Sequence, residues 1–128
     1  MKQLSDLKRI FSEQGHAIKF GCSEAEYEKM VELCHEMNSR KSVCVVANWI
    51  WWDITSDNPS FPQPTYIVKA DNVLFDEKGR FPVGGWVRTS PLKALHQNCI
   101  FETGNTFYVL VGEGTRKEVS ASDALAFF

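Results

Sequence analysis

The amino-acid sequence predicts an α+β fold in which N-terminal helices pack on an antiparallel sheet of about five strands. Residues 1–40 carry apolar side chains at helical spacing. Residues 43–117 instead form short β-rich runs separated by glycine-bearing turns, as in a β-meander. Residues 120–128 are expected to form a short C-terminal helix, with Ser120 or Ser122 as its cap. The length of 128 residues fits a single domain.

Two helices are expected in the N-terminal third of the chain. Leu4, Leu7 and Ile10 recur at helical spacing, and Gly15 is a natural stop for this first helix. Residues 23–26, Ser-Glu-Ala-Glu, form a capping box, in which the serine and the second glutamate satisfy amides at the start of a second helix. The apolar stripe of that helix consists of Tyr27, Met30, Val31, Cys34 and Met37.

Residues 43–54 predict a strand at the centre of the sheet. Side chains alternate between the two faces of a strand, and here both faces are apolar, which is typical of a strand covered on both sides. One face would carry Val43, Val45, Ala47, Trp49 and Trp51, and the other would carry Cys44, Val46, Asn48, Ile50 and Trp52.

The rest of the chain alternates turns with short strands. Three prolines predict a loop over 55–64, because proline removes an amide donor and fixes the backbone. Thr103-Gly104-Asn105 is a hairpin signal. The remaining elements are expected to be strands over 66–75 and 86–89, a helical turn over 92–96, paired strands over 99–102 and 106–111, and a turn over 112–114 that closes the meander.

The composition argues against several classes of protein. A net charge of −2 does not fit a generic nucleic-acid binder, which would carry a basic excess. No segment approaches the roughly 20 apolar residues of a membrane span. The N-terminus lacks the apolar core of a signal peptide, so we expect a cytoplasmic protein. The four cysteines have no CxxC spacing and are expected to be free, mostly buried thiols.

The first candidate site is a surface that binds a protein partner. Three tryptophans fall within four positions of the predicted central strand, so their rings lie on both of its faces. Either all the rings belong to the core, or one face is an exposed aromatic platform. The acidic side of the predicted second helix is either a solvated surface or part of the same site. The partner-binding residues would be Trp49, Trp51, Trp52 and Asp53, with Glu28, Glu32 and Glu36 as steering charges.

The second candidate site is a polar pocket that binds an anion or another small ligand. Arg88 falls inside a predicted strand. It can project from the sheet to hold an anion, or it can form a structural pair with Glu102. Ser90 has no nucleophile elbow around it, so no catalytic residue is assigned. The three histidines are scattered, so neither a metal site nor a cofactor is expected. The residues of this pocket would be Arg88, Ser90, Glu102 and Arg116.

Three segments, NWIWWDI, ADNVLFDEKGRFPVGGWVRTSPL and IFETGNTFYVLVGEGTRK, resemble in this order a family of small proteins from proteobacteria and their phages. The likeness covers mainly Val43–Lys117. That family is described as a domain of unknown function. The resemblance therefore implies a compact bacterial or phage domain and transfers no catalytic residue.

We favour a non-enzymatic protein-binding module, in the form of an immunity or inhibitor protein that occludes a toxin, a nuclease or a defence effector. Small size, mild acidity and the lack of a catalytic constellation in the sequence motivate this hypothesis. One alternative is a small enzyme or ligand-binding protein with its pocket around Arg88. Another is a structural subunit that associates with itself through an exposed sheet edge. The sequence leaves the oligomeric state and the identity of the partner open.

Overall fold

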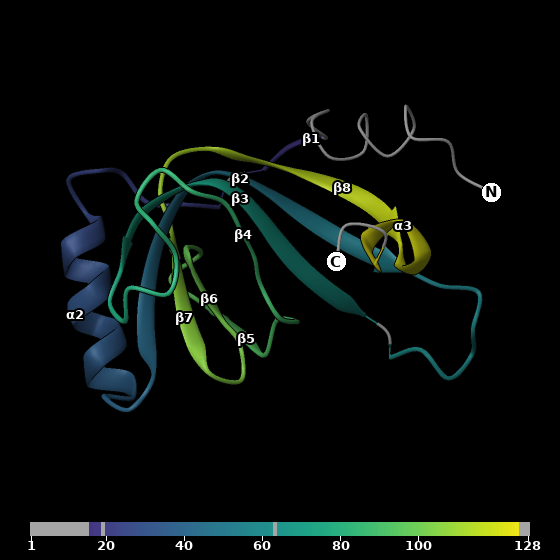
Figure 1. The fold of residues 1–128 in the computed structure, drawn as a ribbon, viewed down its shortest axis with the longest axis horizontal. Coiled ribbons are helices and arrows are strands. Elements are labelled where there is room, and N and C mark those ends of the chain that lie inside the picture. Colours follow the sequence, from purple (N-terminus) through teal and green to yellow (C-terminus); the bar gives the residue numbers. More distant parts are fainter. Residues whose placement is uncertain (1–15, 19, 63, 126–128) are drawn as a thin grey trace.

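The computed structural model describes residues 16–18, 20–62 and 64–125. Within these ranges eight strands form one mixed sheet, and two helices lie at opposite ends of its long strands (Figure 1). In chain order the elements are β1 (His16–Ile18), α2 (Tyr27–Met37), β2 (Ser42–Thr55), β3 (Thr65–Asp76), β4 (Val87–Arg88), β5 (Ala94–His96), β6 (Ile100–Glu102), β7 (Thr106–Leu110), β8 (Gly114–Ser120) and α3 (Ala121–Leu125).

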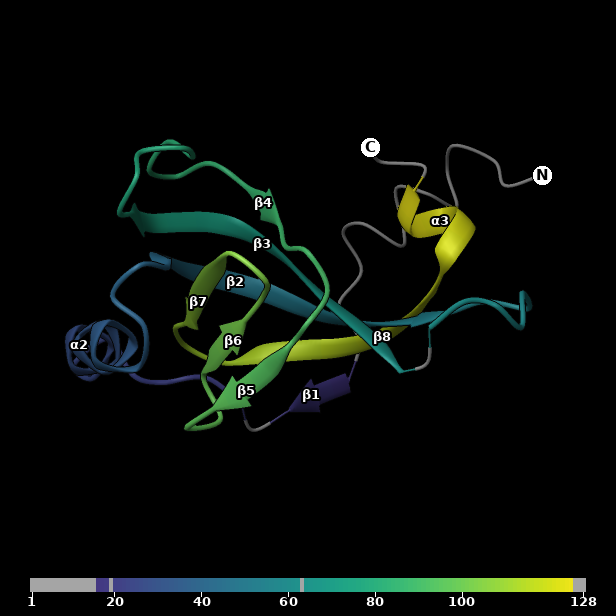
Figure 2. The ribbon, with the colours of Figure 1, turned by 90° about the horizontal axis from the view of Figure 1, so that it is seen from below.

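Strand β2 is the centre of the sheet. β3 pairs with it in antiparallel fashion along most of its length. On the other edge of β2, β7 pairs in parallel with the first half and β8 in parallel with the second half. β6 and β5 extend the sheet beyond β7, β1 extends it beyond β8, and β4 lies outside β3 (Figure 2). Apolar clusters also cover both faces of β2, which explains why residues 43–54 are an almost unbroken apolar run.

The predicted architecture is wrong in two respects. The sheet is mixed rather than antiparallel, because β7 and β8 both run parallel to β2, and it has more than five strands. Among the described residues, one helix of 11 residues precedes β2, instead of a layer of helices. The helix predicted before Gly15 falls on residues 1–15, which lie outside the described ranges. Parallel pairing joins segments that are distant in sequence and leaves no mark on local periodicity.

The helix expected after the capping box is confirmed as α2. Its first turn differs in detail from the prediction, because Glu26 is the N-cap and the helix begins at Tyr27. The Glu26 carboxylate accepts a hydrogen bond from the Ser23 amide at 3.2 Å, as a capping box requires. The Ser23 hydroxyl, however, donates to the same carboxylate at 2.8 Å and accepts no hydrogen bond from the first amides of the helix. Cys34 is the side chain that α2 buries completely.

Several smaller elements test the local predictions. The strand over 66–75 is confirmed as β3, and the hairpin around Thr103 as β6 and β7. The Ser120 hydroxyl accepts the Asp123 amide at 3.2 Å and so caps the predicted terminal helix. The helical turn over 92–96 is wrong, because β5 pairs there with β6. The chain after Gly112 does not end the sheet either, since it continues as the seven-residue strand β8.

Strand β2 changes its alternation at Asn48. Up to Ala47 the odd-numbered side chains pack toward α2, whereas from Trp49 onward they pack on the opposite face. Asn48 itself has a φ of 52°, in the left-handed region that asparagine tolerates better than most residues. Because of this one residue, the side chains that follow it project from the opposite face to the one that strict alternation would give. The simple alternation that the sequence predicts is therefore wrong beyond Ala47.

Three apolar clusters result from this arrangement. The α2 cluster lies between α2 and the first half of β2, the central cluster lies on the opposite face, and the α3 cluster lies beside α3 at the far end of β2. Their members include Val43, Phe107 and Val109 in the α2 cluster, Trp49, Trp51 and Phe101 in the central cluster, and Ile50, Trp52 and Ile67 in the α3 cluster.

The indole of Trp49 packs directly against the backbone of two glycines. A Cβ atom built on Gly114, the first residue of β8, would lie 2.4 Å from three ring atoms of Trp49. A Cβ atom on Gly21 would lie 2.1 Å from the carbonyl oxygen of Gly112, and Gly21 has a φ of +111°. Both positions therefore require glycine, since any side chain there would displace the ring or the backbone.

Replacing Gly114 by alanine is expected to lower the free energy of unfolding by about 2 kcal/mol or more, because the new methyl group collides with a buried ring in a closely packed core. Gly104→Ala is the matched control. Nothing lies within 4 Å of its added Cβ, and its change should stay within about 0.5 kcal/mol. Urea denaturation followed by tryptophan fluorescence measures the free energy of unfolding of both variants. Equal stability of the two variants would show that Trp49 does not need the close approach.

Candidate functional site

The three tryptophans of the first predicted site are buried. Their exposed fractions are 2% for Trp49, 3% for Trp51 and 0% for Trp52. Trp51 is the hub of an aromatic group, with its ring centroid 5.2 Å from Phe20 and 5.3 Å from Tyr66. The expectation of an exposed aromatic platform is therefore wrong for these rings, which form the core of the sheet instead.

Asp53 and Arg116, which belong to different predicted sites, meet in one cluster between β2 and β8. Arg116 Nε donates to Asp53 Oδ2 at 2.7 Å, and Trp51 Nε1 donates to Asp53 Oδ1 at 3.2 Å. The Arg116 guanidinium also lies over the rings of Trp51 and Tyr66, 6.0 and 5.8 Å from their centroids. The hydrogen bond to Asp53 raises the pKa of Arg116. These contacts give both residues a structural role at the open side of the central cluster.

The four residues of the predicted polar pocket do not converge. Residues that pair directly across strands point to the same face. Arg88 pairs with Lys69, which pairs with Ile50, so Arg88 lies on the face of the α3 cluster. Arg116 pairs with Trp51 and therefore lies on the opposite face.

Glu102 also lies apart from Arg88, because its partners come from other segments. Lys41 Nζ donates to one carboxylate oxygen, and His96 Nε2 lies 2.8 Å from the other. Lys41 also donates to the Thr103 carbonyl at 2.9 Å. Burial would raise the pKa of Glu102, but the hydrogen bonds from Lys41 and His96 outweigh it and the pKa is lowered. Ser90 is exposed. Both the polar pocket and the pair between Arg88 and Glu102 are thus wrong.

A third ion pair fixes the turn after β3. Arg80 Nη2 donates to Asp76 Oδ1 at 2.9 Å, and Arg80 Nε donates to Asp76 Oδ2 at 3.1 Å, in a bidentate pair. Arg80 Nη1 reaches Thr106 Oγ1 at 3.0 Å. Burial of the Asp76 side chain opposes its charge, yet the hydrogen bonds from Arg80 dominate and its pKa is lowered.

The outer side of α2 carries a different kind of surface, which the structure leaves exposed. Glu28, Glu32 and Glu36 all project from it as predicted. Two of them border a groove of about 390 Å³ that runs beside the helix and reaches the turn before β6. We call this hollow the α2 groove; it is lined by Glu26, Lys29, Met30, Glu32, Leu33, Glu36 and Gln97.

Sequence reasoning found only part of the α2 groove. Glu32 and Glu36 were predicted, whereas Glu28 is exposed outside the lining. Glu26 was identified only as a capping residue. No local pattern could have indicated Gln97, which comes from a distant turn and has a φ of 52°. Tertiary packing alone brings that turn to the side of α2.

Acid is expected to weaken the fold through the two internally paired carboxylates. The folded-state pKa values of Asp76 and Glu102 lie below their ordinary values of 3.8 and 4.5. Their stabilising contribution is therefore complete above this range and is lost as the pH falls through the lowered values. Asp76→Asn should cost about 2–3 kcal/mol at pH 7 and flatten the pH dependence below pH 4.5.

Urea denaturation at pH 7 and at several points below pH 4.5 tests this expectation, with Asp57→Asn as a control at an exposed site. The control should match the wild type at every pH. An Asp76→Asn variant with an unchanged acid profile would contradict the role of this pair.

The described residues contain no group of three histidine, cysteine, aspartate or glutamate side chains arranged to hold a metal ion. Among the helices of the same ranges, none is long and apolar enough to cross a membrane. All four cysteines are free and buried. Burial raises the pKa of Cys34, Cys44 and Cys99 to about 12, so these thiols are poor nucleophiles near neutral pH.

Comparison with known proteins extends the resemblance seen in the sequence. Residues 19–126 match the family described as a domain of unknown function, DUF6957. No curated protein and no solved structure matches the chain. The match begins before α2 and ends after α3, so it covers the α2 groove and every described strand except β1, which ends at Ile18. The protein belongs to the DUF6957 family, an uncharacterised family.

Proposed function

We propose that this protein is a non-enzymatic binding module that holds a basic segment of a partner protein in the α2 groove. The observation that carries this proposal is the composition of the groove. Its lining combines three carboxylates, those of Glu26, Glu32 and Glu36, with the apolar side chains of Met30 and Leu33. Such a surface suits arginine or lysine, whose aliphatic stems cover apolar atoms while their charged ends reach carboxylates.

The distribution of the other charges supports the same surface. Asp53, Asp76 and Glu102 each have a cationic partner within the fold. The glutamates of the α2 groove face outward instead, with Lys29 as the one cation in its lining. Glu28 lies on the next exposed turn of α2 and adds to the negative field that would attract a basic partner. Charges arranged in this way raise the rate of association more than they raise affinity.

The partner class follows from the chemistry of the groove. A basic toxin, nuclease or defence effector would present the lysines and arginines that the groove requires. An immunity or inhibitor protein of a proteobacterium or phage would act by covering that basic surface. We place this interaction in the cytoplasm, which four free, buried cysteines support, because thiols stay reduced there.

Affinity capture tests the proposal with charge-neutral variants of nearly unchanged shape. Wild type is expected to retain a basic protein from a host lysate, and Glu32→Gln combined with Glu36→Gln should lose it, because the groove then lacks two of its three carboxylates. The matched control changes two exposed glutamates elsewhere, Glu113→Gln with Glu118→Gln, and should retain the protein. Quantitative mass spectrometry of the bound fractions measures the difference.

The captured protein then allows a test of the electrostatic mechanism. Its association rate with wild type should fall at least about tenfold between 50 and 300 mM salt, because screening weakens steering between opposite charges. Glu28→Gln should lower the rate at low salt with little effect on dissociation. Retention of the partner by the Glu32 and Glu36 variant, or a rate that salt does not change, would contradict the proposal.

A further inference from the structure

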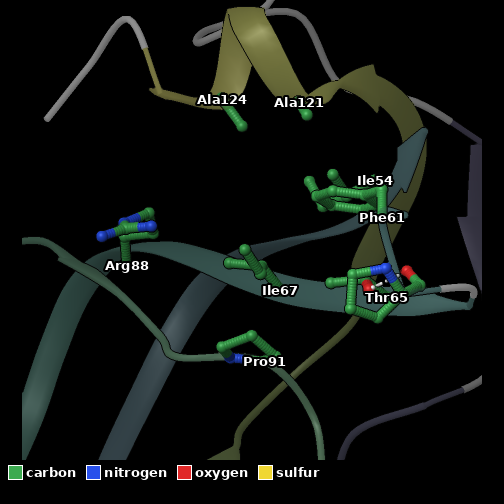
Figure 3. A pocket seen from close by; sticks show the side chains of 9 residues that line it. Ile54, Phe61, Thr65, Ile67, Arg88, Pro91, Ala121 and Ala124 are labelled. Carbon is green, nitrogen blue, oxygen red and sulfur yellow. Dashed lines mark hydrogen bonds between the residues drawn. The ribbon is translucent and has the colours of Figure 1, made fainter. Parts of the chain in front are cut away.

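A second hollow lies at the other end of the sheet, between α3 and the loop end of the β2–β3 hairpin (Figure 3). Its volume is about 290 Å³. It is separate from the α2 groove and does not depend on the function proposed for that groove. We call it the α3 cavity; it is lined by Ile54, Phe61, Pro62, Thr65, Ile67, Arg88, Pro91, Ala121 and Ala124.

The α3 cavity exists because small side chains face large ones across it. Ala121 and Ala124 of α3 point toward Ile54 and Ile67 of the sheet, and their methyl groups leave the space between them open (Figure 3). Phe61, from the loop between β2 and β3, closes one side. The lining is therefore almost entirely apolar, which favours an apolar molecule over water.

Arg88 is the charged member of this lining and forms one wall of the α3 cavity (Figure 3). Burial lowers its pKa, but a guanidinium still carries its charge near neutral pH. Arg88 also interacts with other parts of the chain. Its planar group has five N–H donors, so it can hold an additional anion beside those contacts. A carboxylate would pair with it more strongly here than in water, because the surroundings are apolar.

We propose that the α3 cavity binds a small amphipathic monocarboxylate, with its hydrocarbon part between α3 and the sheet and its carboxylate on Arg88. The volume limits the size of this ligand. An apolar cavity of about 150 Å³ holds one benzene molecule. The α3 cavity has nearly twice that volume, which suits an alkyl or aryl-alkyl acid of about ten non-hydrogen atoms.

Titration calorimetry with octanoate and octanamide tests the proposal, because the two probes share one size and shape and differ in charge. Octanoate is expected to bind wild type with a Kd of about 1 mM or tighter. It should bind at least about tenfold more tightly than octanamide, since only the anion pairs with Arg88. Arg88→Gln should reduce this preference to about twofold or less, while Arg40→Gln, the same change at an exposed site, should preserve it.

A variant that fills the α3 cavity tests whether the probes bind there and not elsewhere on the protein. Ala124→Leu places a larger side chain in the α3 cavity, keeps Arg88 in the sequence and should abolish binding of both probes. Circular dichroism and thermal unfolding confirm that each variant is folded. Equal affinity of wild type for octanoate and octanamide, undiminished binding by folded Ala124→Leu, or no octanoate binding at all would overturn the proposal.

Discussion

The contact between Trp49 and the backbone of Gly114 is the constraint on which the sheet depends. Strand β2 pairs with β7 along its first half and with β8 along its second half, so one edge of β2 must pass from one partner to the other. Between the pair Val46–Leu110 and the pair Ile50–Thr115, β2 advances four residues while its partner advances five. The indole of Trp49 lies at this transition, where only a glycine allows the ring and the backbone of β8 to come so close. The left-handed backbone at Asn48 turns the ring toward the central cluster.

The charged residues of the fold form two groups with different physical roles. Carboxylates near the core are neutralised by cations from neighbouring segments, as in the pairs of Asp53 with Arg116 and Asp76 with Arg80. Breaking such a pair leaves a poorly solvated charge, so these groups serve stability. The glutamates of α2 project into solvent at the outer layer of the fold, where a change of charge costs little stability. That contrast supports the proposal that α2, and not the ionic clusters of the sheet, recognises a partner.

The two hollows of the molecule lie against opposite ends of β2 and have different chemistry. The lining of the α2 groove is mainly acidic with two apolar side chains, whereas that of the α3 cavity is apolar with one cationic side chain. Helices of different size form them. α2 has 11 residues and buries one cysteine completely against the sheet, while α3 has five and covers the sheet with alanines. Among the described residues, no apolar cluster includes both α2 and α3.

The sequence by itself determined the elements whose causes lie within a few residues. These are the amphipathic helix after Ser23, the apolar strand over 43–54, the hairpin around Thr103 and the short helix after Ser120. It also identified the exposed glutamates of α2, because helical spacing separates them from the apolar stripe. Only the tertiary structure decided that the sheet is mixed, that Trp49 and Trp51 lie in its interior, and that Asp53 pairs with Arg116. Each of these depends on which distant segments lie side by side and in which register. A shift of one residue reverses the face of every side chain that follows, so local periodicity cannot specify them.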